Sequence, residues 1–441
     1  MKIVLIGAGS YVFAPTVLED AIVKHKLADS EIVLVDLNLE AVRAMAEAAR
    51  RVSAELNVPI AISYTADRAE ALPGADYVIV SASPQGAKRW AMDYEVLKNF
   101  GLADQARECG GLGGMLNAFR SITLIMDICR DMERLCPNAR LLDVTNPMPR
   151  VVTAVERFSS IQGMGFCNIA HLGENGYTFL PQLLGRTGAD VEIVTAGLNH
   201  FAWLLEMKDK ATGEDLMPAI RQYVLDGDWS GQPEHAQIEL KIMRRWLLEY
   251  GGIAAGSVHH HAEYLPVQAD VRYADVPPYH GDESTRRAWM QMLQDIGAGQ
   301  ADWRGMFEHK SWEHPLDVAL ALHEGSDREI DIVNVPNRGC LQGIPEGRIV
   351  EVPLSIQGGV PVGVAVPALP EGVSSLCAIL SEVHEMVAEA AVKGDRKLAH
   401  RTIDFDPAIT DKAAAHAAFD RMIELHLDLL PQFAVQSSSR N

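Results

Sequence analysis

The sequence predicts an α/β fold with a doubly wound parallel sheet in its N-terminal part and a helix-rich α+β region after it. Three apolar segments predict the sheet. Lys2–Ser10, KIVLIGAGS, runs into a glycine turn, and Glu31–Asn38, EIVLVDLN, contains an acid after its apolar run. The third segment, Asp76–Ser81, DYVIVS, is almost wholly apolar. Such composition is typical of strands that are buried on both faces of a parallel sheet.

The first two segments form the pattern of a Rossmann-like dinucleotide site. Gly7 permits the tight turn, Gly9 lets the backbone approach a pyrophosphate, and the following helix offers its N-terminal N–H groups. Asp36 can accept hydrogen bonds from the adenosine ribose, which favours NAD over NADP. Val12 stands where a full fingerprint has a third glycine, so an ordinary strand–turn–helix is the alternative. The predicted cofactor-binding residues are Gly7, Gly9, Ser10, Asp36, Ser81 and Asn146.

The remaining elements follow in the order that a parallel sheet requires. We expect helices over 39–56, 92–100 and 115–135, strands over 60–64 and 76–81, strands ending at Asn146 and Cys167, and a strand pair or bent strand over 192–207. The polar segment near residue 208 predicts a boundary between an NAD-binding domain, 1–207, and a substrate-binding and oligomerisation domain, 208–441. In the second domain we expect helices over 237–250, 285–296, 375–392 and 412–430, and a β-rich insert containing IDIVNVPN and GRIVEVPLSI.

Composition restricts the partner and the compartment. The chain has 441 residues and a formal net charge of −20, which argues against nucleic acid and against an anionic membrane surface. A small molecule is the expected partner. Met1 leads directly into the first strand and we find no apolar run long enough to span a bilayer, so we expect a cytoplasmic protein. Six scattered cysteines predict buried thiols or a ligand rather than disulfides.

Three groups of residues could carry chemistry. Cys167 and His200 could hold a divalent metal with open positions, although a buried thiol and a core histidine are the alternative. ECGGLGG, which begins at Glu108 and precedes the helix of Arg120, could be a flexible loop over a substrate or a plain helix start. SVHHHAEYLP, which begins at Ser257, offers histidines that could act as a general base.

Together these motifs resemble glycoside hydrolase family 4, the NAD-dependent glycosidases. The resemblance spans nearly the whole chain. It rests on the IGAGS start, Glu108 with its glycines running into FRSI, TNP at Thr145–Pro147, Cys167-Asn168, GLNHFAW at Gly197–Trp203, VNVPN at Val333–Asn337 and VEVP at Val350–Pro353.

The resemblance implies a divalent metal, usually manganese, on Cys167 and His200, and bound NAD that takes hydride from sugar carbon 3 and later returns it. A base removes the carbon 2 proton between these steps, the glycosidic bond breaks by elimination, and water adds. Members that act on unphosphorylated sugars carry Asp-Arg-His where this chain has Val258, His259 and His260. This points to His260 as the base, with His259 and then Tyr264 as alternatives.

The resemblance also implies the substrate contacts. These are Glu108, Arg120, Asn146 and Asn168, of which Asn168 is also a candidate catalytic residue. The implied substrate is an unphosphorylated glucoside, galactoside or hexuronide, and the implied assembly is a homodimer or homotetramer. The rival functions are an NAD-dependent dehydrogenase of a sugar or 2-hydroxy acid and a catalytically silent NAD-binding sensor.

Overall fold

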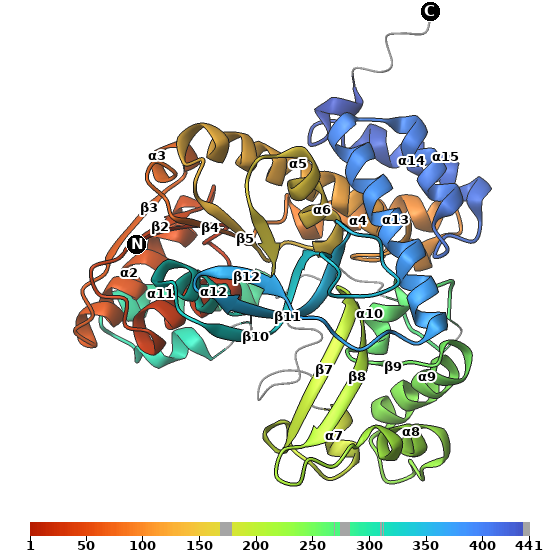
Figure 1. The fold of residues 1–441 in the computed structure, drawn as a ribbon. Coiled ribbons are helices and arrows are strands. Elements are labelled where there is room, and N and C mark those ends of the chain that lie inside the picture. Colours follow the sequence, from red (N-terminus) through yellow and green to blue (C-terminus); the bar gives the residue numbers. More distant parts are fainter. Residues whose placement is uncertain (168–178, 269, 274–282, 309–310, 312, 435–441) are drawn as a thin grey trace, which may run out of the picture.

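One mixed sheet runs through the molecule in the computed structural model, which describes residues 1–167, 179–268, 270–273, 283–308, 311 and 313–434 (Figure 1). Its strand order is β3-β2-β1-β4-β5-β6-β10-β11-β7-β8-β9, with β12 paired to β11. The strands from β1 to β6 are parallel, and the others join them in antiparallel pairs.

The parallel half confirms the predicted doubly wound sheet. Its strands are β1 Lys2–Ile6, β2 Glu31–Val35, β3 Ala61–Thr65, β4 Tyr77–Val80, β5 Arg140–Asp143 and β6 Gly163–Gly165. Ile3 and Leu5 of β1 belong to one hydrophobic cluster, while Val4 and Ile6 belong to the cluster on the opposite face. Because successive side chains of a strand point to opposite faces, both faces of this half are buried.

Helices cover these two faces. The N-terminal helices are α1 Phe13–Glu19, α2 Leu39–Glu55, α3 Arg68–Ala71, α4 Gly86–Asn99, α5 Gly111–Leu135 and α6 Met148–Phe158. A π-helix, η1 Asp20–Lys24, continues α1, and a 3₁₀ turn, η2 Ala103–Gln105, precedes α5. Helices α4 and α5 begin earlier than the expected residues 92 and 115, at Gly86 and at Gly111, so the glycine-rich segment before Met115 is already helical.

The antiparallel half joins segments that are far apart in the chain. Its strands are β7 Val191–Leu198, β8 Phe201–Asp209, β9 Ile253–Ala254, β10 Arg328–Pro336, β11 Ile349–Gln357 and β12 Val360–Gly363. Strands β10 and β11 lie between β6 and β7, so the two expected domains share one sheet. The division near residue 208 remains a prediction about domain organisation.

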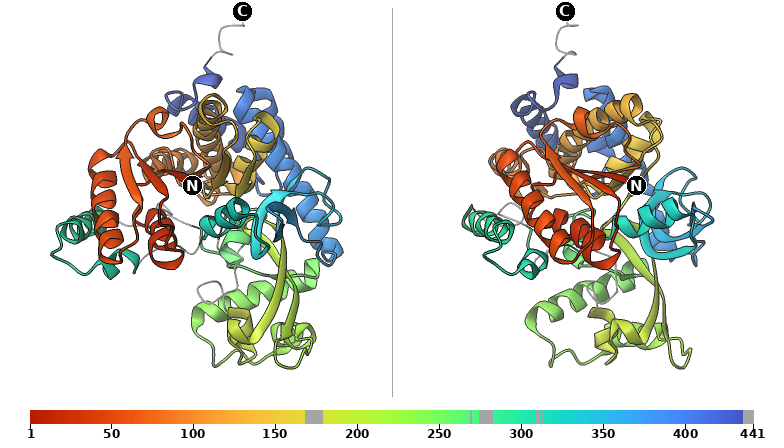
Figure 2. Two further views of the ribbon diagram at one scale, coloured as in Figure 1. Left: turned by 60° about the vertical axis from the view of Figure 1, so that its left-hand side comes forward. Right: turned by 90° about the vertical axis from the view of Figure 1, so that its left-hand side faces the viewer.

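The remaining helices form two groups. In Figures 1 and 2, α13 Glu371–Lys393, α14 Arg396–Phe405 and α15 Lys412–Leu425 lie beside α4, α5 and α6, whereas α8 Met217–Asp226 and α9 Glu234–Tyr250 accompany β7 and β8 at the other end. Helix α11 Glu283–Gly297 packs on α2. The others are α7 Phe179–Leu183, α10 Val258–Ala262 and α12 Pro315–Glu324, with the 3₁₀ turns η3 Gly188–Asp190, η4 Trp303–Phe307 and η5 Pro431–Phe433.

Helix α5 corrects one expectation. By length and composition alone this helix could span a membrane, so the chain does contain an apolar run of that size. However, 83 % of its most apolar 18-residue stretch is buried inside the protein. It is the central helix of the core, packed against α6 and α13.

Candidate active site

A cavity of about 1440 Å³ lies at the carboxyl ends of the parallel strands. Pockets for drug-sized ligands usually measure about 300–1000 Å³, so this cavity has room for a larger ligand or for two. It brings together nine of the predicted site residues: Gly9, Ser10, Asp36, Ser81, Glu108, Asn146, Cys167, His200 and His260. They meet because parallel strands end at one edge of their sheet, where ligands of open α/β folds bind.

Neighbouring residues restrict the backbone of the glycine turn that follows β1. Gly7 has φ +89°, and a Cβ at this position would lie 1.9 Å from the Ser81 carbonyl oxygen. Gly7 therefore permits β1 and β4 to approach, and it is not part of the cavity lining. The Gly9 N–H donates to Asp36 Oδ2 over 2.8 Å, and the Asn38 N–H donates to Asp36 Oδ1 over 2.8 Å. Asp36 is thus held in place by two backbone donors.

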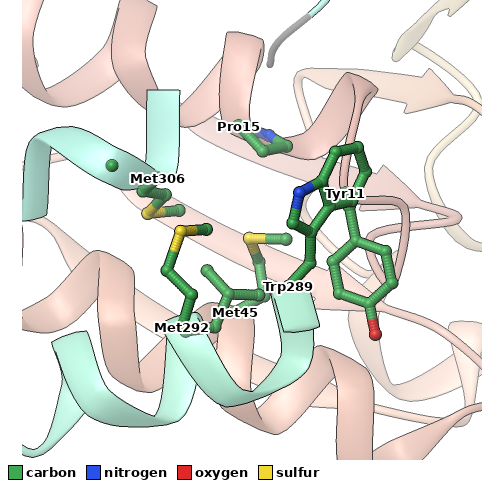
Figure 3. Close-up of a pocket in the computed structure, with 8 residues that line it drawn as sticks. Tyr11, Pro15, Met45, Trp289, Met292 and Met306 are labelled. Atoms are coloured by element: carbon green, nitrogen blue, oxygen red, sulfur yellow. The ribbon is translucent and has the colours of Figure 1, made fainter. Parts of the chain in front are cut away.

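Helix α11 covers the Asp36 end of the cavity, and the sequence did not predict this. Its residues Glu283, Arg286 and Trp289 line the cavity, and the ring of Trp289 meets the ring of Tyr11 edge-on at 5.5 Å. Beside them is a small apolar pocket lined by Tyr11, Pro15, Met45, Trp289, Met292 and Met306 (Figure 3). The amphipathic pattern of α11 predicts a helix, but nothing local in the sequence indicates which strand end it covers.

Cys167 and His200 converge as expected. Cys167 follows β6, and His200 occupies the two-residue turn between β7 and β8 with φ 61°. Cys167 Sγ lies 3.5 Å from His200 Nε2. Burial is the main cause that lowers the pKa of His200 well below its usual value, so its imidazole is neutral, the form that binds metals.

This geometry fits a shared metal ion. With metal–sulfur and metal–nitrogen bonds of about 2.3 and 2.0–2.1 Å, ligands 90–110° apart are separated by about 3.1–3.6 Å. The described residues contain no group of three or more His, Cys, Asp or Glu side chains that could hold a metal. Water, a bound ligand or residues outside the described set would complete the coordination.

Of the three adjacent histidines, the structure brings His260 to the cavity. Its ring lies 4.4 Å from the ring of His200, and burial is the main cause that lowers its pKa. In the described part of the chain, no partner is found for the buried Nδ1 atom of His260. A neutral imidazole in this position can accept a proton.

The alternative bases are not placed at the cavity. His259 is exposed and does not line it, because neighbouring residues of a helix point in different directions. Tyr264 is 1 % exposed and also outside the lining, and burial raises the pKa of its hydroxyl well above the usual value. The structure therefore places His260, and not His259, at the cavity, and the identity of the base remains a prediction.

Glu108 lies beside Asn146 in the cavity. Asn146 Nδ2 donates to Glu108 Oε1 over 3.2 Å. Burial, reinforced by the neighbouring Glu263 carboxylate, raises the pKa of Glu108 to about 7, while the hydrogen bond from Asn146 opposes this rise. Glu108 can therefore exist in both protonation states near neutral pH.

The glycine-rich segment after Glu108 is a packed helix start rather than a flexible loop. Glu263 Oε2 accepts hydrogen bonds from the N–H groups of Cys109 and Gly110 over 2.7 and 3.2 Å. A Cβ on Gly110 would lie 1.9 Å from the Glu263 carbonyl oxygen, and a Cβ on Gly114 would lie 2.3 Å from the Cys109 carbonyl carbon. The contact with Glu263 joins this segment to the histidine run on α10.

The predicted substrate contact Arg120 is not among the described residues that line the cavity. Arg120 is buried, and its guanidinium lies 2.8 Å from the Asp93 carboxylate, away from the cavity lining. The expectation that Arg120 meets a substrate is therefore not supported by its position. Asn168 lies outside the described residues.

Three of the sequence motifs meet behind the Cys167–His200 pair. Glu351 Oε1 accepts from Asn199 Nδ2 over 2.7 Å and from Asn334 Nδ2 over 3.0 Å. Glu351 is opposite Asn334 in the β10–β11 pair, and burial raises its pKa to about 7. The motifs GLNHFAW, VNVPN and VEVP suggested these residues, but their mutual contact requires the sheet order.

The fold and cavity define an α/β protein with a Rossmann-like N-terminal part and a polar site at its strand ends. Two family models match the chain: the family 4 glycosyl hydrolase over residues 2–175 and its C-terminal domain over residues 195–409. The chain belongs to this family of glycosidases.

Individual members of the family have low sequence identity to this chain. The chain is 28 % identical to an alpha-glucosidase of Erwinia rhapontici, with 96 % of this chain and 97 % of that protein covered. It is 27 % identical to a probable 6-phospho-beta-glucosidase of Bacillus subtilis, with 98 % of each covered. It is also 28 % identical to an alpha-galacturonidase of Thermoanaerobacterium saccharolyticum, with 80 % of each covered.

Solved structures share the fold. The protein lplD of Bacillus subtilis has a TM-score of 0.80 at 23 % identity, with 96 % of this chain and 99 % of that chain covered. A 6-phospho-alpha-glucosidase from gut microorganisms, crystallised with NAD and Mn²⁺, has a TM-score of 0.76 at 20 % identity, with 98 % and 99 % covered.

Proposed function

We propose that this glycosidase hydrolyses the O-glycosidic bond of a small, unphosphorylated glycoside with the help of NAD and a divalent metal ion such as Mn²⁺. The observation that carries the proposal is the convergence of Cys167, His200, His260 and Glu108 on one cavity that also contains the Gly9–Asp36 turn. The 6-phospho-alpha-glucosidase with NAD and Mn²⁺ supports the choice of both groups.

The residues present suit these groups. The Gly9–Asp36 turn would hold the adenosine part of NAD, and Cys167 with His200 would hold the metal. When bound, NAD would exchange hydride with sugar carbon 3, and the metal would stabilise negative charge on the sugar oxygens.

The chain's own side chains would move the protons. His260, neutral and facing the cavity, would remove the proton from carbon 2. Glu108, whose pKa is raised to about 7, would be protonated often enough to donate to the leaving oxygen, and Asn146 would hold its carboxyl in place. The packed contact between Glu263 and the start of α5 would hold His260 and Glu108 at fixed positions relative to each other.

The charge of the cavity favours an uncharged sugar. Among the described lining residues, the arginines are Arg286 and Arg287 on α11, and the charge of Arg286 acts on Tyr11 near Asp36. Glu108 lines the same cavity as Cys167, and when ionised it would repel a 6-phosphate or a carboxylate. We therefore expect a glucoside or galactoside to be a better substrate than a hexuronide.

A screen of nitrophenyl glycosides and glycuronides, with and without a phosphate on carbon 6, tests the proposal. The assay contains NAD, Mn²⁺ and a reductant, and it follows both nitrophenol and NADH. We expect release of nitrophenol from unphosphorylated compounds without stoichiometric NADH. Accumulating NADH would identify a dehydrogenase instead, and NAD binding without cleavage of any compound would identify a sensor.

Location and assembly belong to the same proposal. We infer a cytoplasmic enzyme that acts as a homodimer or homotetramer. The net charge of −20 supports a small-molecule substrate rather than nucleic acid or an anionic membrane.

A further inference from the structure

Two histidines face each other on the outer helices, outside the cavity lining. His400 of α14 and His416 of α15 place their Nδ1 atoms 2.8 Å apart, and their ring centroids are 4.9 Å apart. Their side chains are 30 % and 32 % exposed, so one side of the pair is open to water. The proposed glycosidase mechanism does not use them.

The opposite ring nitrogens are each held by a carboxylate. His400 Nε2 lies 3.2 Å from Asp420 Oδ1, and His416 Nε2 lies 2.8 Å from Asp404 Oδ1. A carboxylate oxygen accepts, so each Nε2 donates its hydrogen. When both imidazoles are neutral, both Nδ1 atoms therefore carry a lone pair, and two lone pairs at this distance repel unless a proton or a metal ion lies between or beside them.

The surroundings favour a cation. Asp404 and Asp420 contribute negative charge, and Arg396 offsets part of it at 4.0 Å from Asp420. The ring of Phe419 packs against His400 at 5.0 Å and limits its rotation. Histidines that bind metals usually donate their second ring N–H to a carboxylate, which fixes the tautomer and the ring orientation.

We propose that His400 and His416 form a second cation site, for a first-row divalent ion that takes ligands at 90°, such as Ni²⁺ or Cu²⁺. With metal–nitrogen bonds of about 2.0 Å, two ligands at 90° are about 2.8 Å apart, the separation seen here. Water completes the coordination on the open side. The ion joins α14 to α15 and stabilises the C-terminal helices.

A cation that joins α14 to α15 would also affect the segment that precedes Glu108. The connection between α14 and α15 passes Ala408, whose carbonyl oxygen accepts from Gln105 Nε2 over 3.0 Å. Gln105 belongs to η2, just before Glu108. A cation between α14 and α15 would therefore limit the motion of Gln105, which lies close in sequence to Glu108 but outside the cavity lining.

Ni²⁺ titration of chelator-treated protein by calorimetry tests this site. The wild type and the His416→Gln variant both keep Cys167 and His200, so the difference between them isolates the outer pair. We expect the wild type to bind one equivalent more than His416→Gln, and Asp404→Asn to weaken that equivalent by about 10- to 100-fold. His235→Gln, a change at an exposed histidine on α9, is the matched control and should bind like the wild type.

Two further measurements keep the outcome interpretable. Ni²⁺ should raise the melting temperature of the wild type more than that of His416→Gln, and Cu²⁺ electron paramagnetic resonance should show a site with two nitrogen ligands in the wild type that is absent from the variant, which keeps only one of the two histidines. Equal stoichiometry in the two proteins would overturn the proposal. So would a pair that shares a proton only, seen as a stability difference between the proteins that varies with pH and is unaffected by Ni²⁺.

Discussion

Burial acts in opposite directions on the two ionisable side chains at the centre of the cavity. It raises the pKa of Glu108 to about 7 and lowers the pKa of His260. At neutral pH the carboxyl is therefore partly protonated while the imidazole is neutral, which gives one potential proton donor and one potential acceptor. Two groups whose environments separate their protonation states in this way are suited to acid–base catalysis.

His260→Ala should lower kcat by about 10²- to 10⁴-fold, because the proposed general base is lost. It should also abolish exchange of the carbon 2 hydrogen with deuterium from solvent, measured by NMR of the recovered substrate. His259→Ala is the control, because His259 is exposed and outside the cavity, and its exchange rate should match the wild type. Undiminished exchange in His260→Ala would remove His260 from the mechanism.

The pH profile tests Glu108 separately. If the protonated carboxyl donates to the leaving oxygen, kcat should fall as pH rises through about 7, the value to which burial raises the pKa of Glu108. Glu108→Gln should lower kcat and remove that descending limb, most clearly with poor leaving groups that need a proton. A profile of unchanged shape in Glu108→Gln would assign the limb to another group.

The residues that could be predicted are those that local patterns place at strand ends. Asp36, Ser81, Asn146 and Cys167 follow buried strands, so the parallel order alone brings them together. The position of Arg120 could not be predicted, because its partner Asp93 lies on another helix. The same limit applies to the placement of Trp289, which depends on how α11 packs.

At the scale of elements, the strands behind the Cys167–His200 pair are joined by a buried carboxyl. Glu351 on β11 accepts from Asn334 on β10 and from Asn199 in the β7–β8 turn. In the described residues, the second oxygen of Glu351 and the amide oxygens of both asparagines have no partner. A proton on Glu351 would supply one missing hydrogen bond, which agrees with its raised pKa of about 7.

Glu351 should make stability depend on pH. An acid whose folded pKa is raised from 4.5 to about 7 binds its proton more tightly in the folded state, so stability is full below the unfolded pKa and is lost as pH rises through 7. The loss is of the order of 3 kcal/mol by pH 8.

Two variants check this by denaturant unfolding at pH 5 and pH 8. Glu351→Gln stays uncharged, so its stability relative to the wild type should improve between the two pH values. Glu351→Ala should cost about 1–3 kcal/mol at pH 5, because it leaves buried amides unpaired. Parallel behaviour of the wild type and Glu351→Gln would show that Glu351 is ionised at both pH values.

The helix boundaries show what local patterns capture. Helices α2 and α9 lie within a few residues of the expected ranges, because their apolar periodicity is strong. Helix α15 ends at Leu425 rather than 430, where the buried His426 ring turns to meet Asp93 over 2.6 Å. The two residues are 333 positions apart in the sequence, so no local pattern predicts their contact.

At the scale of the whole molecule, one sheet connects the two regions that the sequence separated. Strands β10 and β11 are inserted between β6 and β7, so Cys167 and His200 approach each other through strands from the second region. The parallel half could be predicted from its apolar segments, whereas the insertion could not, because antiparallel partners far apart in sequence have no shared local pattern.

Removal of the metal ion should abolish the activity of the enzyme reversibly. A thiolate is a soft ligand for the hard manganese ion, so Mn²⁺ on Cys167 and His200 should exchange readily. Dialysis against a chelator should abolish glycoside cleavage and added Mn²⁺ should restore it, while Cys167→Ser should need more Mn²⁺ for half-maximal activity. His416→Gln should respond like the wild type, because its change lies outside the cavity. Full activity in the chelator would rule out a required metal.

In the proposed mechanism the glycosidic bond breaks only while NAD holds a hydride taken from the sugar. The most direct measurement compares cleavage of a glycoside carrying deuterium on carbon 3 with cleavage of the unlabelled compound, with and without NAD. We predict slower cleavage of the labelled glycoside and none by protein freed of nucleotide. Equal rates for the two compounds, together with cleavage by nucleotide-free protein, would show that cleavage does not depend on hydride transfer to NAD.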